Sequence, residues 1–206
     1  MNQDNTATAV LQIVRLKGRV NAATLADSLG LTQDAAQAQL AAWLAAEAIQ
    51  DAKGQFRMTP AGREQLAARI EAERSSVDHD QLHAAYDEFH HLNTEFKTLV
   101  TDWQVRGGQP NDHTDAAYDV GIMNRLADLD ARWQPLLKQM LALAPRMAPY
   151  PARFAVALAK MRAGDSAWFA RPILDSYHTV WFELHEDLIG LLGLSREAEA
   201  AAGRAE

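Results

Sequence analysis

Residues 22–40 read AATLADSLGLTQDAAQAQL, two short helical segments separated by a single glycine. Ala26 and Gly30 are four residues apart, and the small residue Ala36 follows six positions after the glycine. This order of small residue, glycine and small residue allows two helices to cross closely around a tight turn. Thr32 stands where its hydroxyl can accept a free backbone N–H at the start of the second helix. The stretch therefore predicts a helix-turn-helix.

The flanking segments complete a larger pattern. An apolar helix ends at Gly18, and the helix after Thr32 is predicted near residues 33–47. Residues 49–58, IQDAKGQFRM, alternate around a Lys-Gly turn and predict a β-hairpin. Thr59-Pro60 then opens another helix, with Thr as the cap and Pro in the first turn. This order of elements is that of a winged helix. The predicted inner face of the 33–47 helix comprises Ala36, Leu40, Trp43 and Leu44.

The remainder of the chain is predicted to be helical. Apolar residues recur every seven positions in 79–105 and 114–147, and such long stripes require a partner helix. That partner lies either in a second copy of the chain or within the same bundle. Pro135 is expected to kink or divide the second of these helices, and Gly107-Gly108 marks a loop. The last strong helix is predicted over about 172–192, with Leu174 among its inward-facing residues.

Composition sets the class of protein. The chain has 206 residues, of which 48% are apolar and 23% charged, so it can form a sizeable core. It has no cysteine, which excludes a disulfide scaffold, a zinc ribbon and a thiol nucleophile. Neither a membrane-spanning stretch nor a signal peptide is evident, so we expect a cytoplasmic protein without membrane contacts. The expected fold is mainly α: a winged helix-turn-helix over 1–75 and an all-α helical bundle over 76–206.

The net charge of −7 is unevenly distributed. Residues 1–75 contain eight Lys and Arg and eight Asp and Glu, so this part is neutral and the remainder carries the whole −7. Nucleic acid would therefore avoid the C-terminal part and meet only the N-terminal part.

Residues 7–75 resemble the winged-helix regulators of the MarR type, through the helix-turn-helix, the hairpin and the phrase MTPAGRE at 58–64. The resemblance implies DNA binding, with the 33–47 helix in the major groove and the hairpin beside the backbone. That helix has no Lys or Arg between Thr32 and Glu47. Its glutamines can read adenine, and the phosphate contacts must come from elsewhere. The predicted DNA-binding residues are Arg15, Lys17, Arg19, Thr32, Gln33, Gln37, Lys53, Gln55 and Arg57.

Histidines and acids in the helical part suggest a metal site. Asp87 and His91 are four apart on one helix and can offer two ligands. With His178 they faintly resemble the metal-binding helical domains of GntR-type regulators. The plainer alternative is that these histidines lie on the surface or beside the core.

The stretch 177–188, YHTVWFELHEDL, is the richest in aromatic, His and acidic residues. Such residues can line a small-molecule pocket, although aromatic stripes at this spacing are more often core. The predicted ligand-binding residues are His90, Trp103, His178, Trp181 and His185.

No catalytic motif appears, neither a nucleophile elbow, a phosphate loop nor a dinucleotide fingerprint. We therefore expect no enzyme activity and no cofactor. The leading hypothesis is a homodimeric transcriptional regulator that binds double-stranded DNA and responds to a small-molecule effector. The alternatives are a protein-interaction adaptor whose winged helix no longer binds DNA, and a metal-dependent helical enzyme or sensor.

Overall fold

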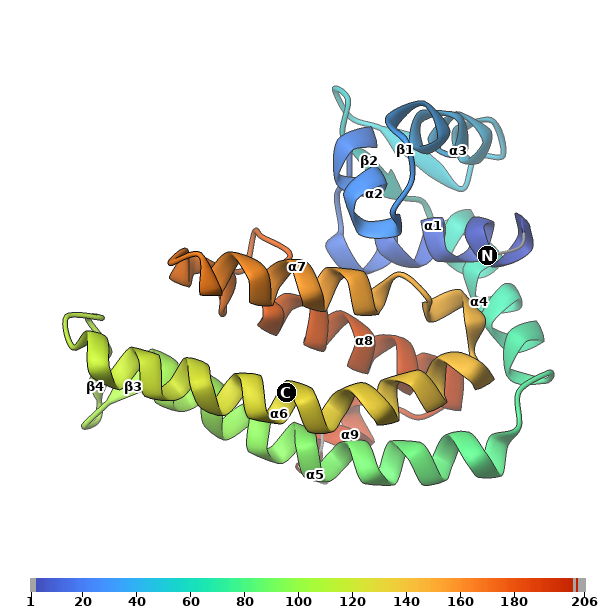
Figure 1. The fold of residues 1–206 in the computed structure, drawn as a ribbon. Coiled ribbons are helices and arrows are strands. Elements are labelled where there is room, and N and C mark those ends of the chain that lie inside the picture. The colour runs from blue at the N-terminus through green and yellow to red at the C-terminus, as the bar shows by residue number, and fades with distance from the viewer. Residues whose placement is uncertain (1–2, 202, 204–206) are drawn as a thin grey trace.

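The computed structural model describes residues 3–201 and residue 203, which form a mainly helical structure with two short hairpins (Figure 1). The N-terminal elements are α1 (Gln3–Lys17), α2 (Ala22–Leu29), α3 (Gln33–Ala45), β1 (Ile49–Asp51), β2 (Phe56–Met58) and α4 (Pro60–Arg74). They are followed by α5 (His79–Gln104), β3 (Val105–Arg106), β4 (Gln109–Pro110), α6 (Ala116–Leu143), η1 (Pro145–Met147), α7 (Tyr150–Arg162), η2 (Ser166–Trp168), α8 (Tyr177–Leu192) and α9 (Arg196–Ala201).

Local sequence signals set the ends of the N-terminal helices. The Thr32 hydroxyl accepts the backbone N–H of Ala35 at 3.2 Å, and the Thr59 hydroxyl accepts that of Gly62 at 3.0 Å. Gly30 ends α2 with a φ of 64°, a left-handed conformation that glycine adopts without a steric penalty. The caps predicted at Thr32 and Thr59 are thus confirmed.

Strands β1 and β2 pair antiparallel, with Ile49 opposite Met58. Val20, just after α1, adds a short bridge to Phe56 and so ties the hairpin to the first helix. Gly62 lies against the chain entering the hairpin, where a Cβ atom would lie 1.9 Å from the carbonyl oxygen of Ala48. Only glycine lets α4 approach the hairpin this closely.

The buried apolar residues form two separate clusters. One lies within α1 to α4 and includes Leu11, Leu40 and Phe56. The other lies within α5 to α8 and is centred on aromatic side chains such as Phe89 and Trp133. Helices α5 and α6 run side by side along their length, and α7 and α8 lie between this pair and the N-terminal elements (Figure 1). The apolar stripes of α5 and α6 are therefore covered within the chain.

Several predicted boundaries were wrong. Helix α3 ends at Ala45, and Leu44 is 41% exposed, because Trp43 occupies the inner position after Ala36 and Leu40. Helix α6 is not divided at Pro135, so of the two expected effects only a kink stays a prediction. Helix α8 begins at Tyr177, capped by Ser176, and not near residue 172, so Leu174 lies outside it and is half-buried. None of the helices in the described residues is long and apolar enough to cross a membrane.

Candidate functional sites

Helix α3 is presented at the end of the molecule away from α5 to α8 (Figure 1). It packs on α1, α2 and β1 through Ala36, Leu40 and Trp43. Its outer surface exposes Gln33 and Gln37, which lie four residues apart and therefore share one face. Thr32, at the N-terminus of the helix, is also exposed. This surface is free to contact a partner.

The β1–β2 hairpin places further predicted DNA-binding residues beside α3. Lys53 lies exposed at the tip, with a φ of 60°, and the Asp51 carboxylate accepts the N–H of Gly54 at 2.7 Å. Gln55 and Arg57 are half-buried. Lys53 is therefore the cation of the hairpin that is best placed to meet a phosphate.

The three cations at the end of α1 are placed differently from one another. The Lys17 ammonium lies 2.5 Å from Asp175 and 3.0 Å from Glu183, and its side chain is only 12% exposed. Arg15 donates to Gln12 at 3.1 Å and lies 4.0 Å from Glu186. Arg19 is exposed and forms no ion pair within residues 3–201. Lys17 thus faces the helical bundle, whereas Arg19 is open to solvent.

Lys17 belongs to a buried group of charges, the Asp175 cluster, which also contains Arg153 and Glu183. The Arg153 guanidinium donates to Asp175 at 2.9 Å and to Glu183 at 2.5 Å. Burial raises the pKa of Asp175, but Arg153 and Lys17 outweigh that effect and hold it below its ordinary value. Two cations therefore face two carboxylates, and the cluster is electrically balanced.

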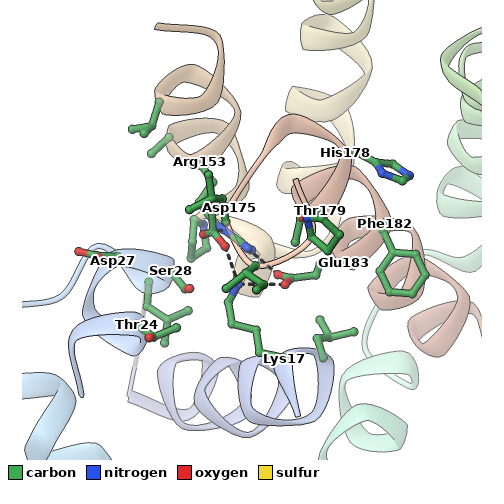
Figure 2. A pocket seen from close by; sticks show the side chains of 18 of the residues that line it. Lys17, Thr24, Asp27, Ser28, Arg153, Asp175, His178, Thr179, Phe182 and Glu183 are labelled. Carbon is green, nitrogen blue, oxygen red and sulfur yellow. Dashed lines mark hydrogen bonds and ion pairs between the residues drawn. The ribbon is translucent and has the colours of Figure 1, made fainter. Parts of the chain in front are cut away.

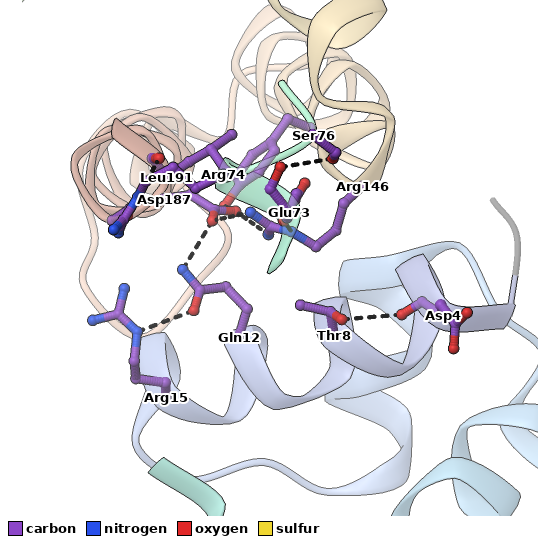
Figure 3. Close-up of polar contacts among 12 residues, drawn as sticks. Asp4, Thr8, Gln12, Arg15, Glu73, Arg74, Ser76, Arg146, Asp187 and Leu191 are labelled. Carbon is purple, nitrogen blue, oxygen red and sulfur yellow. Dashed lines mark hydrogen bonds and ion pairs between the residues drawn. The ribbon is translucent and has the colours of Figure 1, made fainter. Parts of the chain in front are cut away.

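A second group, the Asp187 cluster, joins the same two parts of the chain (Figure 3). Arg146 donates twice to Asp187, at 2.8 and 2.9 Å, and once to Glu73 at 2.5 Å. Gln12 and Tyr150 also donate to Asp187, at 2.9 and 3.1 Å. Burial lowers the pKa of Arg146, but Asp187 and Glu73 more than reverse this and raise it. Every member of the cluster has a partner.

Arg74, the last residue of α4, adds a third connection. Its guanidinium donates to the carbonyl oxygens of Leu191 at 3.1 Å and Gly190 at 2.8 Å. These carbonyls lie at the C-terminal end of α8, where they have no partner within the helix and where a cation is favoured. The N-terminal elements are thus joined to the bundle by three sets of polar contacts.

A large cleft opens beside the Asp175 cluster (Figure 2). Its volume is about 1210 Å³, and it lies between α2 with the end of α1 on one side and α7, α8 and residues 168–175 on the other. Among the predicted site residues, Lys17, Arg19, Gln55 and His178 line it.

The other predicted ligand-binding residues pack inside the bundle. Trp181 donates to Asn93 at 2.8 Å, and Trp103 stacks on Phe169 with ring centroids 4.4 Å apart. His185 lies 3.0 Å from the Tyr86 hydroxyl, and burial lowers its pKa from 6.5 to about 4. His90 contacts Tyr86 edge-on, with ring centroids 4.2 Å apart. Of the predicted set, only His178 is brought to the cleft.

The structure does not assemble the predicted metal ligands. Asp87 and His91 are exposed on α5, whereas His178 lines the cleft from α8. In the part of the chain that the structure describes, no group of three His, Asp or Glu side chains is placed to hold a metal ion.

The role of the residues that join the two parts was not predicted from the sequence. Glu183 and Asp187 lie four apart on α8 among Leu184 and Leu188, and Arg146 lies between buried apolar residues. The one available signal was a charge inside an apolar stripe, since such a charge must find a buried partner. The identity of the partner, up to 175 residues away, carries no local signal.

Comparison with known proteins does not extend these observations. No family model matches the chain, and neither curated proteins nor solved structures show significant similarity to it.

Proposed function

We propose that residues 3–74 are a winged helix-turn-helix that binds duplex DNA, with α3 as the recognition helix and β1–β2 as the wing. The observation that carries the proposal is the placement of α3. It is remote from the bundle, its outer face is exposed and carries Gln33 and Gln37 in its N-terminal half, and the hairpin with Lys53 stands beside it. A recognition helix needs this freedom to enter the major groove.

The chemistry of α3 favours reading of bases over attraction to phosphates. Gln33 and Gln37 can each pair with the edge of an adenine through two hydrogen bonds. With no cation on α3, the phosphate contacts must come from cations outside it, of which Lys53 on the wing and Arg19 after α1 are exposed. Few phosphate contacts imply weak non-specific binding and a shallow dependence on salt.

The test is selection of bound duplexes from a random pool by the full-length protein at low salt. The double variant Gln33→Ala, Gln37→Ala should bind the selected duplex at least roughly tenfold more weakly, since each lost paired contact costs about 1–3 kcal/mol. The matched control is Gln109→Ala, on the exposed hairpin β3–β4 far from α3 (Figure 1). Equal binding by both variants would contradict the proposal.

A separate variant tests the wing. Lys53→Ala should weaken binding to all sequences alike and lower the slope of log affinity against log salt by about 1. Lys138→Ala, at another exposed position on the bundle, is the control and should leave the slope unchanged. A Lys53 variant with an unchanged slope would remove the wing from the proposed interface.

We also propose that the protein acts as a homodimer, because helix-turn-helix proteins commonly read two symmetric half-sites. The selected duplexes should then be palindromic. The stripes of α5 and α6 are covered within the chain, so the dimer must use another surface.

A second candidate is a protein-interaction adaptor. It is favoured by the absence of cations on α3, the 41% exposure of Leu44 and the engagement of Lys17 with the bundle. A stoichiometric protein partner whose binding is lost in Leu44→Asp, with no duplex selected from the pool, would support the adaptor over the regulator.

A further inference from the structure

We propose that the cleft between α2 and the α7–α8 surface binds an uncharged, largely apolar small molecule with one hydrogen-bonding group. Its volume of about 1210 Å³ accommodates a molecule of drug-like size. The cleft is concave and lies between two separately packed cores, which is a common place for such sites.

Exposed apolar side chains gather at this cleft. Among the described residues, six large hydrophobic side chains are exposed, and three of them line it: Val156 on α7, Ile173 before α8 and Phe182 on α8. Ile173 is 93% exposed. Surface apolar residues scattered singly need no explanation, but a group of them around one concavity indicates a binding site.

The charges in the cleft favour an uncharged occupant. Within the Asp175 cluster, Lys17 and Arg153 already neutralise Asp175 and Glu183 through short contacts. The remaining ionised side chains, Arg19 and Asp27, are one cation and one carboxylate. A charged ligand would lose its hydration without gaining a counter-charge that is not already paired.

A polar group also faces the site. The hydroxyl of Ser28 on α2 is buried and has no hydrogen-bond partner among the residues described. Ser28 lines the cleft on the side opposite Thr179 and Phe182 (Figure 2). An unpaired buried hydroxyl is costly, so a ligand with one hydrogen-bonding group is better suited to this wall than a pure hydrocarbon.

A ligand in the cleft would contact both the N-terminal elements and the bundle. Leu16 and Leu29 form the wall on the α1–α2 side, and α2 leads directly into α3. A ligand that touches both walls favours one placement of α2 and α3 over others, and so changes the affinity for DNA. This consequence rests on the proposed function, whereas the binding site does not.

The first experiment uses N-phenyl-1-naphthylamine, an uncharged aromatic amine that fluoresces in apolar surroundings, with the full-length protein. We expect saturable binding at one site per chain. Ile173→Asn and Val156→Asn should each weaken binding roughly tenfold, through loss of apolar contact with the probe. Both side chains are exposed, so folding should be retained, which the helical circular dichroism signal checks.

Val120→Asn is the matched control. Val120 is as exposed as Val156, 48% each, but lies on α6 outside the cleft. Non-saturable binding, or an equal loss in the control, would overturn the proposal. Tighter binding of the sulfonated analogue 8-anilinonaphthalene-1-sulfonate would overturn the assignment of an uncharged ligand.

A second measurement distinguishes ligand binding in the cleft from the proposed effect of the ligand on DNA binding. The probe should change the affinity for the selected duplex severalfold in the wild type but not in Ile173→Asn. Probe binding with no effect on that affinity would refute the regulatory link. Probe binding by a protein that selects no duplex would refute the proposed function while leaving the site intact.

Discussion

Among single residues, the buried charged side chains cost the most free energy to remove from water. Arg146 and Asp187 are 2% exposed, and Arg153 is 4% exposed. Removing such groups from water costs several kcal/mol each, and only complete pairing offsets this. The Asp175 cluster pairs two cations with two carboxylates, and in the Asp187 cluster Arg146 serves both Asp187 and Glu73, so each carboxylate depends strongly on its cation.

The variant Arg146→Ala should therefore be severely destabilised. It would leave Asp187 and Glu73 without their cation, and the loss expected for breaking a buried pair is about 3–5 kcal/mol. Arg132→Ala, which breaks the exposed pair with Glu95, should change the free energy of unfolding far less, because solvent screens that pair. Urea denaturation of both variants tests this, and similar midpoints would show that Arg146 contributes no more than a surface cation.

His185 should make stability depend on pH. Burial lowers its pKa from 6.5 to about 4, so between these values the unfolded chain binds a proton that the folded chain does not. The stability that depends on neutral His185 is therefore fully present above about pH 6.5 and is lost as the pH falls toward 4. From pH 7 to pH 4 the wild type should lose up to about 3 kcal/mol more than His185→Gln. His91→Gln, at an exposed position of α5, should follow the wild type; the same loss in His185→Gln would contradict the prediction.

At the scale of elements, helix ends and close approaches follow from short-range chemistry. Thr32 and Thr59 could be recognised as caps because the hydroxyl and its backbone partner lie three residues apart. The start of α8 could not be predicted as well. The apolar residues before it continue a helical spacing, and the Ser176 cap that interrupts them is a common residue with several uses.

Two glycines in helices should respond oppositely to alanine. Gly62→Ala would drive a Cβ atom into the Ala48 carbonyl and should cost about 1–3 kcal/mol. Gly121→Ala, in open space on α6, should stabilise by about 0.5–1 kcal/mol because alanine restricts the unfolded chain. Thermal midpoints of the two variants check this, and stabilisation in both would show that α4 can move away from the hairpin.

At the scale of the whole molecule, two apolar cores meet across a polar boundary. Apolar periodicity is local, so the sequence predicted much of each core, but it also placed Leu44 and Leu174 there wrongly. It could not predict the boundary, because Lys17 meets Asp175 and Glu183 across 158 and 166 residues of chain. For the same reason the position of the cleft was not foreseen: its walls come from α2, α7 and α8, and of the residues predicted to bind a ligand only His178 lines it.

The Asp175 and Asp187 clusters between the two cores should make unfolding cooperative. We expect the wild type to unfold in one calorimetric transition, with the calorimetric and van't Hoff enthalpies equal. The double variant Lys17→Ala, Arg146→Ala cuts both clusters and should show two transitions, one for each core. Arg125→Ala with Arg132→Ala, which cuts two exposed pairs on α6, should keep a single transition. Two transitions already in the wild type would show that the clusters do not join the cores.

The uneven distribution of charge makes one end of the molecule neutral and the rest of it acidic. The neutral N-terminal part lies at one end and the −7 of residues 76–206 is spread over the helices behind it. Near any polyanion the protein experiences a torque, which turns its acidic end away before contact. Under the proposed function, encounters with DNA that begin with the bundle foremost are repelled most, and those that begin with α3 foremost are repelled least. This orienting effect extends over roughly one Debye length, about 10 Å at 0.1 M salt, so added salt should weaken both the orientation and the repulsion of the acidic end.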